Sequence, residues 1–317
     1  SYRTRKGIGI SGRGFKVPTR VTVSNLVDPQ QSYTPLQEKK VNSLYGSASF
    51  AYDSYLYLDL TGRNDWSSTL SADNRSYFYP SASLSFIPSQ AFDFSSSPIN
   101  FLKFRGSWAQ VGADTGVYQL TETFNLAANG YLDLVQISRP SVKFSPDLKP
   151  EQTVSSEVGL EFKMFNNRFF GDFSYYSINI NDLIFDVPVP AATGYSTFRE
   201  NVGELTNKGF ELLLGGTPVK TDDLEWVISA NISKNDNKLV SLIDDLDNFS
   251  FAGNNGGDVQ VQATVGGGYG DIYGRTWKRV EEGVDAGKIL LNSEGRPQAE
   301  SELKKLGNYQ PDYVGGI

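Results

Sequence analysis

The sequence predicts an all-β fold built as an antiparallel up-and-down sheet. Three observations lead to this prediction: the composition favours strands and turns, apolar and polar residues alternate along seven or eight long segments, and short and long connections alternate between them. The 317 residues include 31 Gly, 20 Phe, 17 Tyr and 4 Trp, whereas only 21% are charged. Because aromatic residues are enriched in strands and Gly in turns, we do not expect helices to dominate.

The composition also excludes several classes of function. The chain contains no His and no Cys, which excludes Ser-His-Asp and Cys-His catalytic systems, thiolate or imidazole zinc sites and disulfides, and we expect no cofactor. The net charge of -7 and the lack of a clustered basic run argue against a nucleic-acid partner. No segment approaches the roughly 18 apolar residues of a membrane helix, but a membrane β-barrel stays compatible with the sequence.

Each expected strand has one apolar and one polar side. Residues 55–63 are the clearest case, because three Leu residues alternate there with Tyr, Asp and Thr. The same alternation recurs at residues 44–52, 81–86, 102–108, 157–163, 210–214 and 226–233, with a less regular segment at 168–184. The recurrence predicts a meander of seven or eight strands, whereas a single alternating run would be a weak signal.

The connections between these strands alternate in length. The short connections are residues 53–54, 87–100, 166–167 and 216–223. The long connections are residues 66–76, 113–149, 185–197 and 235–312. All long loops therefore lie at one end of the meander. This asymmetry is typical of bacterial outer-membrane barrels, and strands of about ten residues tilted about 40° match the roughly 25 Å height of their apolar band.

A soluble β-sandwich, such as a secreted carbohydrate-binding module, also alternates and stays open as the alternative at this point. The polar side favours the barrel, because it is mostly Ser, Thr, Asn and Tyr with scattered charges, as a hydrated lumen tolerates. In the barrel the apolar side faces lipid. The residues expected to face lipid are Leu56, Leu58, Leu60, Leu102, Phe104, Trp108, Leu160, Phe162 and Leu212.

Several segments, in this order along the chain, resemble the SusC/RagA family of TonB-linked (TonB-dependent) outer-membrane transporters. They are GRNDWSST at 62–69, NRSYFYPSASLSF at 74–86, LKFRGSWAQVG at 102–112, LKPEQT at 148–153, SEVGLE at 156–161, YYSININDLI at 175–184, GY at 194–195, NVGE at 201–204, NKGFEL at 207–212, GDIYG at 270–274 and PDYVGG at 311–316. Together these motifs cover most of the chain, and the match is highly specific.

The resemblance implies a bacterial outer-membrane protein that performs no catalysis. It implies a 22-stranded transmembrane β-barrel with a plug domain in its lumen, a SusD-like surface lipoprotein as a lid, and import of oligosaccharides or peptides driven by the TonB complex. No plug domain or TonB box precedes Ser1, and further strands would follow Ile317. We therefore expect a sector of about eight strands from the barrel domain, without the plug domain and the C-terminal strands.

The barrel hypothesis divides the chain into four parts. Residues 1–41 are expected to be an extracellular loop, and residues 42–238 the strands with their short periplasmic turns and long extracellular loops. Residues 239–312 are expected to be another long extracellular loop, and residues 313–317 the start of the next strand.

Aromatic residues in the long loops are the candidates for contact with a substrate or a partner protein, because they offer large rigid surfaces with a polar tip. These candidates are Trp66, Tyr118, Tyr131, Tyr195, Phe198, Tyr269, Tyr273 and Trp277. The alternative for each is that it packs its own loop or belongs to an interfacial aromatic girdle.

Carboxylates on the polar strand sides are expected to line the lumen and to pair with Lys103, Arg105 or Lys163. They are Glu157, Glu161, Asp172 and Glu211. An endo-acting glycosidase, which needs two carboxylates about 5 to 10 Å apart, is the remote alternative. A loop calcium site at Asp244, Asp245 and Asp247 also stays an alternative, although the Gly and the distant Glu of an EF-hand are missing, so a solvated acidic loop is favoured.

Overall fold

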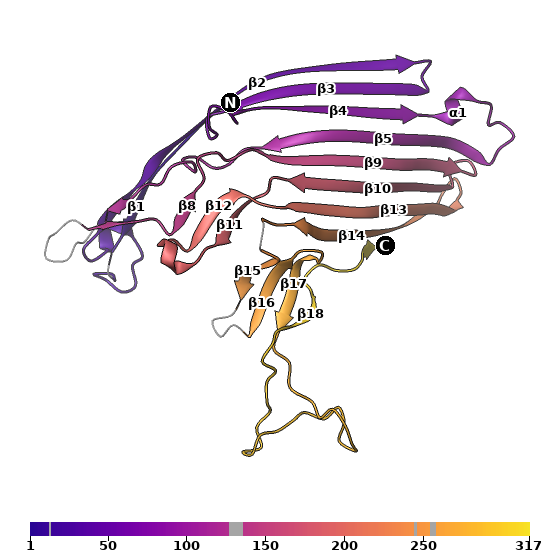
Figure 1. Ribbon diagram of the computed structural model, residues 1–317. Coiled ribbons are helices and arrows are strands. Elements are labelled where there is room, and N and C mark those ends of the chain that lie inside the picture. Colours follow the sequence, from indigo (N-terminus) through magenta and orange to yellow (C-terminus); the bar gives the residue numbers. More distant parts are fainter. Residues whose placement is uncertain (13, 127–135, 244–245, 254–257) are drawn as a thin grey trace.

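The computed structural model describes residues 1–12, 14–126, 136–243, 246–253 and 258–317, and the fold is nearly all-β, as predicted. Ten strands form one antiparallel sheet in the order β1-β2-β3-β4-β5-β9-β10-β13-β14-β19 (Figure 1). Their bounds are β1 Tyr2–Ser11, β2 Gln30–Tyr52, β3 Leu56–Ser67, β4 Ser76–Phe86, β5 Ile99–Ala113, β9 Glu151–Met164, β10 Phe169–Asn181, β13 Glu204–Lys220, β14 Glu225–Ser241 and β19 Val314–Gly316. Within the described residues the sheet is open, with β1 and β19 at its edges.

Smaller elements are inserted in the connections between these strands. Three further sheets contain β11 (Ile184–Pro188), β12 (Thr197–Asn201) and β8 (Val142–Phe144); β15 (Asn248–Gly253), β16 (Val259–Thr264), β17 (Tyr269–Gly274) and β18 (Lys304–Asn308); and β6 (Asn125–Leu126) with β7 (Ile137–Ser138). The helical segments are α1 (Pro88–Ala91) and the 3-10 turns η1 (Val23–Asn25) and η3 (Ala191–Thr193). Among the described residues, no helix is long and apolar enough to cross a membrane.

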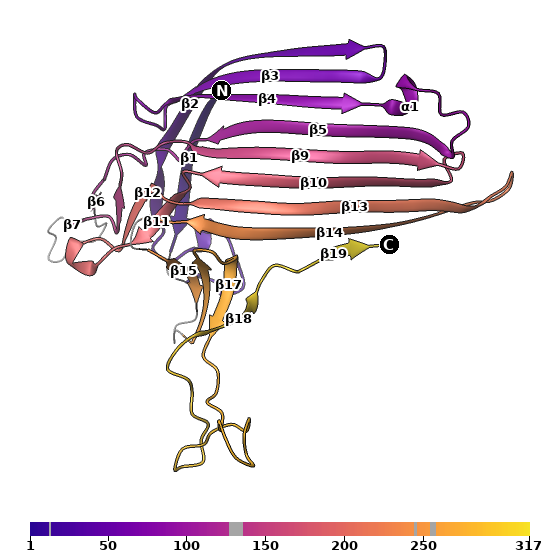
Figure 2. The same ribbon diagram turned by 45° about the vertical axis from the view of Figure 1, so that its right-hand side comes forward.

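The two ends of the main sheet differ in the way the sequence predicts. Figures 1 and 2 show the tight connections β2–β3, β9–β10 and β13–β14, and the one through α1, at one end, whereas the small sheets lie at the other end. Asp53 and Ser54 in the first connection, and Asn166 and Asn167 in another, have positive φ angles, a conformation that short polar residues adopt in hairpin turns. We call these ends the short-turn end and the long-loop end.

Two boundaries differ from the sequence prediction. The turn expected at 216–223 begins later, because β13 continues to Lys220 and its register against β14 shifts between Gly216 and Val219. Pro218 lies where the β13–β14 pairing is interrupted, so its lack of an N–H group costs no ladder hydrogen bond. The segment 168–184, expected as one irregular strand, consists of β10 and the start of the separate strand β11.

The terminal segments assigned to loops contain strands of their own. Residues 1–41 include β1 and the first part of β2, which pair as a hairpin that continues the sheet at the long-loop end. Residues 239–312 include β15 to β18, a four-stranded sheet. Its strands have only five or six residues, so the alternation in β15 and β16 is too short to mark them clearly, and β17 and β18 contain Gly. Residues 314–316 form β19, which pairs with β14.

The strand register brings apolar residues of all eight long strands onto one face. Cross-strand partners share a face, so a row of partners can be followed from one strand to the next. One such row consists of Tyr52, Leu56, Phe86, Phe104, Leu160, Phe173, Leu212 and Ile232. All nine residues predicted to face lipid lie on this side, which we call the apolar face.

The opposite side, the polar face, is lined by small polar and charged residues. One row on this face, three residues away along each strand, consists of Ser49, Asp59, Ser83, Ser107, Glu157, Tyr176, Gly209 and Asn235. A one-residue slip of any strand would exchange its apolar and polar sides, so the pattern specifies the register of each pair.

The buried apolar residues lie at the long-loop end, where they include one residue at the end of β13 and one at the end of β14, and not along the middle of the wall. They are Leu70, Leu148, Val187, Val202, Leu205, Leu239 and Ala263. By contrast, Leu60, Phe104 and Trp108 are 40 to 46% exposed on the apolar face. The described residues contain no second sheet packed against this face, which a β-sandwich would require.

We expect Leu60→Arg to lower the free energy of unfolding of the lipid-inserted intact protein by about 2 to 4 kcal/mol, because it places a charge on the apolar face. The matched change Ser83→Arg should cost much less, since Ser83 lies on the polar face opposite Asp59. Denaturant unfolding in lipid vesicles measures both values. Equal losses would show that the two faces have been assigned wrongly.

Candidate functional site

A charged cluster occupies the polar face in the middle of the wall. Arg105 on β5 donates hydrogen bonds to both carboxylate oxygens of Asp172 on β10, at 2.8 and 2.7 Å, and to the Ser174 hydroxyl at 2.5 Å. Its Nε atom lies 3.6 Å from Glu157 Oε1 on β9, and Ser174 donates to the same carboxylate at 3.2 Å. The bidentate geometry fixes the guanidinium plane across three strands.

The predicted lumen carboxylates therefore take different roles. Asp172 and Glu157 pair with Arg105, as expected, whereas within the described residues no ion pair reaches Glu161 or Glu211. Asp172 and Glu157 share one cation, Arg105, which suits a structural ion pair rather than an acid and base pair across a sugar.

Gly159 makes room for the Arg105 side chain. It lies opposite Arg105 in the β5–β9 register, and a Cβ atom there would be 2.5 Å from Arg105 Nε. Any larger residue must push the guanidinium off the sheet and away from Asp172. The SEVGLE motif at 156–161 thus contains one residue of the cluster, Glu157, and the glycine that admits a second, Arg105.

An aromatic and charged cavity lies at the long-loop end. It has a volume of about 490 Å³, and its lining includes Phe185 and Asp186 on β11, Arg199 on β12 and Phe249 on β15. The rings of Phe185 and Phe249 are 5.2 Å apart, and Phe185 stacks on Tyr269 at 6.3 Å. This arrangement joins two of the small sheets and leaves aromatic and polar groups facing the same space, as ligand cavities commonly do.

Arg199 is held rigidly within this cavity. It donates two hydrogen bonds of 2.6 Å to Asp186, and these bonds raise the pKa of the guanidinium above its ordinary value. It also donates to the Gln119 side chain, and its guanidinium lies 5.5 Å from the Phe144 ring centre. Since both Asp186 oxygens are engaged, the pair presents an ordered polar edge to the cavity.

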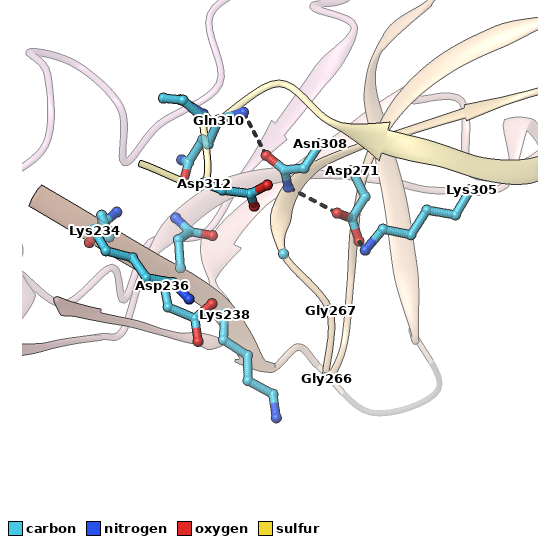
Figure 3. A pocket seen from close by; sticks show the side chains of 14 residues that line it. Lys234, Asp236, Lys238, Gly266, Gly267, Asp271, Lys305, Asn308, Gln310 and Asp312 are labelled. Atoms are coloured by element: carbon cyan, nitrogen blue, oxygen red, sulfur yellow. Dashed lines mark hydrogen bonds and ion pairs between the residues drawn. The ribbon is translucent and has the colours of Figure 1, made fainter. Parts of the chain in front are cut away.

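A second cavity of about 480 Å³ lies between β14 and the four-stranded sheet, and Figure 3 shows the residues that line it. Asp271, only 1% exposed, accepts hydrogen bonds from Lys305 Nζ at 2.6 Å and Asn308 Nδ2 at 2.9 Å. Backbone bonds between Leu239 and the loop at 266–267, of 3.0 and 2.8 Å, attach this sheet to the end of β14. Asp271 therefore holds the sheet together beside the wall.

The arrangement around Asp271 explains why the GDIYG motif at 270–274 contains Gly270 and Asp271. Gly270 has φ +99°, and the Tyr309 ring occupies the place where a Cβ atom would lie. The sequence marks the motif, but the burial of its acidic side chain depends on Lys305 and Asn308, more than 30 residues further along the chain.

The structure distributes the predicted loop aromatics over separate clusters. Tyr195 donates to Glu122 at 2.7 Å beneath the Arg139 guanidinium, Phe198 lies 4.9 Å from Lys143 Nζ, and Tyr269 contacts Phe185. Tyr118 donates to the Leu36 carbonyl at 3.2 Å and so fastens the β1–β2 hairpin.

The remaining aromatic candidates differ in exposure and position. Tyr273 belongs to β17, while Trp66 and Trp277 are 38% and 50% exposed. Tyr131 lies outside the described residues, as do Asp244 and Asp245 of the alternative calcium site. Phe185, Phe249 and Arg199 were not among the sequence candidates. Phe185 is in an apolar run just after the motif at 175–184, and only its neighbours in space mark it as a site residue.

A single antiparallel wall with one apolar and one polar face, tight turns at one end and folded loops at the other defines an outer-membrane β-barrel protein. The chain belongs to the family of the TonB dependent receptor-like beta-barrel, whose model matches residues 3–313. This family consists of outer-membrane receptors and transporters rather than enzymes, and the family predicted from the sequence motifs is confirmed.

The chain is similar to several curated receptors. TonB-dependent receptor P26 of Formosa agariphila is 35% identical over 209 residues, which cover 64% of this chain and 21% of that protein. TonB-dependent receptor SusC of Bacteroides thetaiotaomicron is 30% identical over 235 residues, covering 70% of this chain and 23% of SusC. The chain thus matches about a fifth to a quarter of the length of these two relatives.

The fold is also similar to a solved structure described as that of the RagAB peptide transporter. The TM-score is 0.78 at 22% sequence identity, and the match covers 99% of this chain and 36% of that chain. At this identity the likeness concerns the fold.

We expect Gly159→Ala to lower the unfolding free energy of the intact barrel by about 1 to 3 kcal/mol, because the new methyl group displaces Arg105 from Asp172. Gly106→Ala is the matched control in the adjacent strand, since a Cβ atom there would be 3.9 Å from its nearest neighbour. Denaturant midpoints in lipid vesicles give both values. If the two glycines tolerate alanine equally, the packing described for Arg105 is wrong.

Proposed function

We propose that this chain supplies part of the barrel wall and of the outer mouth of a TonB-dependent importer that takes up oligosaccharides or peptides. The observation that carries the proposal is the apolar row across eight strands, backed by a polar face with a fixed ion-pair cluster. The apolar face, which includes the nine residues predicted from sequence, contacts the lipid of the outer membrane. The polar face borders the hydrated path of the substrate.

The proposal assigns substrate contact to the cavity of Phe185, Asp186, Arg199 and Phe249. Stacked rings bind the apolar faces of sugar rings or peptide side chains, and the Arg199–Asp186 pair offers both a donor and an acceptor for hydroxyl or amide groups. The resemblance of the sequence motifs implies both substrate classes, and the solved structure of similar fold is described as a peptide transporter.

Two partners belong to the proposal. A SusD-like surface lipoprotein would cover the long-loop end, where Trp277 and the small sheets are exposed. The TonB complex would supply the energy for import from the periplasmic side. Co-purification of a lipoprotein with the intact receptor tests the first partner, and loss of uptake on deletion of TonB tests the second.

Uptake by cells that carry the intact receptor tests the function. Deletion of the receptor should abolish growth on either an oligosaccharide mixture or a peptide mixture supplied as the sole carbon source. The mixture on which growth is lost identifies the substrate class. Unchanged growth and uptake on both mixtures would reject the importer proposal.

We expect Phe185→Ala to raise the half-saturation concentration of uptake about three- to tenfold, because one wall of the aromatic cavity is lost. The control is Phe124→Ala, which removes a 63% exposed ring from another long loop outside this cavity. Radiolabelled uptake at equal receptor abundance measures the effect. A response of the same size in both variants would remove the cavity from the substrate path.

A further inference from the structure

A third cavity opens at the long-loop end of β2 and β3. Its volume is about 560 Å³, and it extends under the turn that connects β3 with β4. It is lined by Lys40, Asn42, Trp66, Ser67, Ser68, Leu70, Ala72 and Arg75. We call it the rim notch. None of its lining residues is acidic, and two of them are cations.

The register places Lys40, Asn42 and Trp66 on the apolar face, and Arg75 completes the lining of the notch. Leu44 pairs with Asn64, which pairs with Phe78, and these two apolar side chains are 69% and 57% exposed. The next row on the same face is Asn42 with Trp66, and Lys40 follows beside Ser68. Moving toward the long-loop end, this side of the wall therefore passes from apolar residues to Trp and then to Lys. That succession is typical of the level where acyl chains give way to lipid headgroups.

The cations of the notch are not neutralised, unlike their neighbours on the polar face. Lys39 pairs with Asp114 at 2.5 Å, and Arg63 pairs with Asp65 at 2.8 Å. Within the described residues, neither Lys40 nor Arg75 forms an ion pair. Of two adjacent residues in β2, Lys39 on the polar face thus has an ion-pair partner, whereas Lys40 on the apolar face has none among the described residues.

The backbone holds both cations in place. Lys40 N donates to Ser68 Oγ at 2.9 Å, and Ser68 N donates to the Lys40 carbonyl at 2.9 Å. Ser67 N donates to the Arg75 carbonyl, also at 2.9 Å. The backbone on either side of Trp66 is therefore already fixed, so little backbone freedom is lost when an anion binds the two cations.

We propose that the rim notch binds the phosphate group of an anionic lipid headgroup in the outer leaflet. Lys40 and Arg75 donate charge-assisted hydrogen bonds to the phosphate oxygens, and Trp66 packs beside the headgroup. A lipid phosphate is favoured over a soluble anion because the notch continues the apolar face, where Leu44 and Phe78 meet the acyl chains. The inference does not depend on which nutrient the receptor imports.

The test uses the intact receptor in detergent, with native mass spectrometry to follow binding of phosphorylated lipid A. We expect Lys40→Gln combined with Arg75→Gln to lower the affinity about tenfold or more. The matched control combines Lys16→Gln with Arg20→Gln, which removes one exposed Lys and one exposed Arg from the loop between β1 and β2, outside the notch. This control should bind as the wild type does.

Two further probes identify the source of the phosphate. Dephosphorylated lipid A should bind the wild type as weakly as phosphorylated lipid A binds the double variant, and inorganic phosphate should not displace the lipid. Full competition by inorganic phosphate would make the notch a soluble-anion site and overturn the lipid proposal. Equal binding of phosphorylated lipid A by both double variants and the wild type would overturn the site itself.

Discussion

The hydrogen-bond ladder between neighbouring strands is the constraint on which the rest of this structure depends. In a bilayer, backbone N–H and C=O groups find no water, so each must be paired within the protein. The ladder from β2 to β14 meets this demand, and it does so in one register only, because a slip would turn Leu60 or Phe104 to the water side. The facing of every wall residue, including the Arg105 cluster, follows from that register.

The loops are stabilised by a different principle. The wall has no dry interior of its own, whereas the long-loop end buries Leu148, Leu239 and Val202 almost completely. Buried polar groups such as Asp271 are satisfied by partners from distant segments. The residue pattern of the wall therefore follows from its two surroundings, lipid and water. The structure of the long-loop end instead depends on packing in a buried core. The cavity around Phe185 forms at this end, where side-chain identity is less constrained by the membrane.

The difference between these parts explains what the sequence could predict. Period-2 alternation and loop lengths were sufficient for the eight long strands and for the faces of Leu56 and Leu212. They left open which of four carboxylates pair with Arg105. They were insufficient for β15 to β18, because strands of five or six residues give too short a pattern and because β17 and β18 contain Gly. The cavity around Phe185 also escaped prediction, since its lining comes from segments up to about 135 residues apart in the chain. For the aromatic candidates, residue type could not say which rings meet in space.

The apolar row also fixes the inclination of the wall. The row passes through Leu56, the first residue of β3, and reaches β10 after four further steps from strand to strand. There it meets Phe173, which lies four residues beyond Phe169, the first residue of β10. An advance of one residue per strand, about 3.3 Å against a spacing of about 4.8 Å, corresponds to strands inclined by roughly 35°. Over a band about 25 Å tall, each strand drifts sideways by about three strand widths. Each loop at the long-loop end consequently stands above a part of the wall that another hairpin forms at the short-turn end.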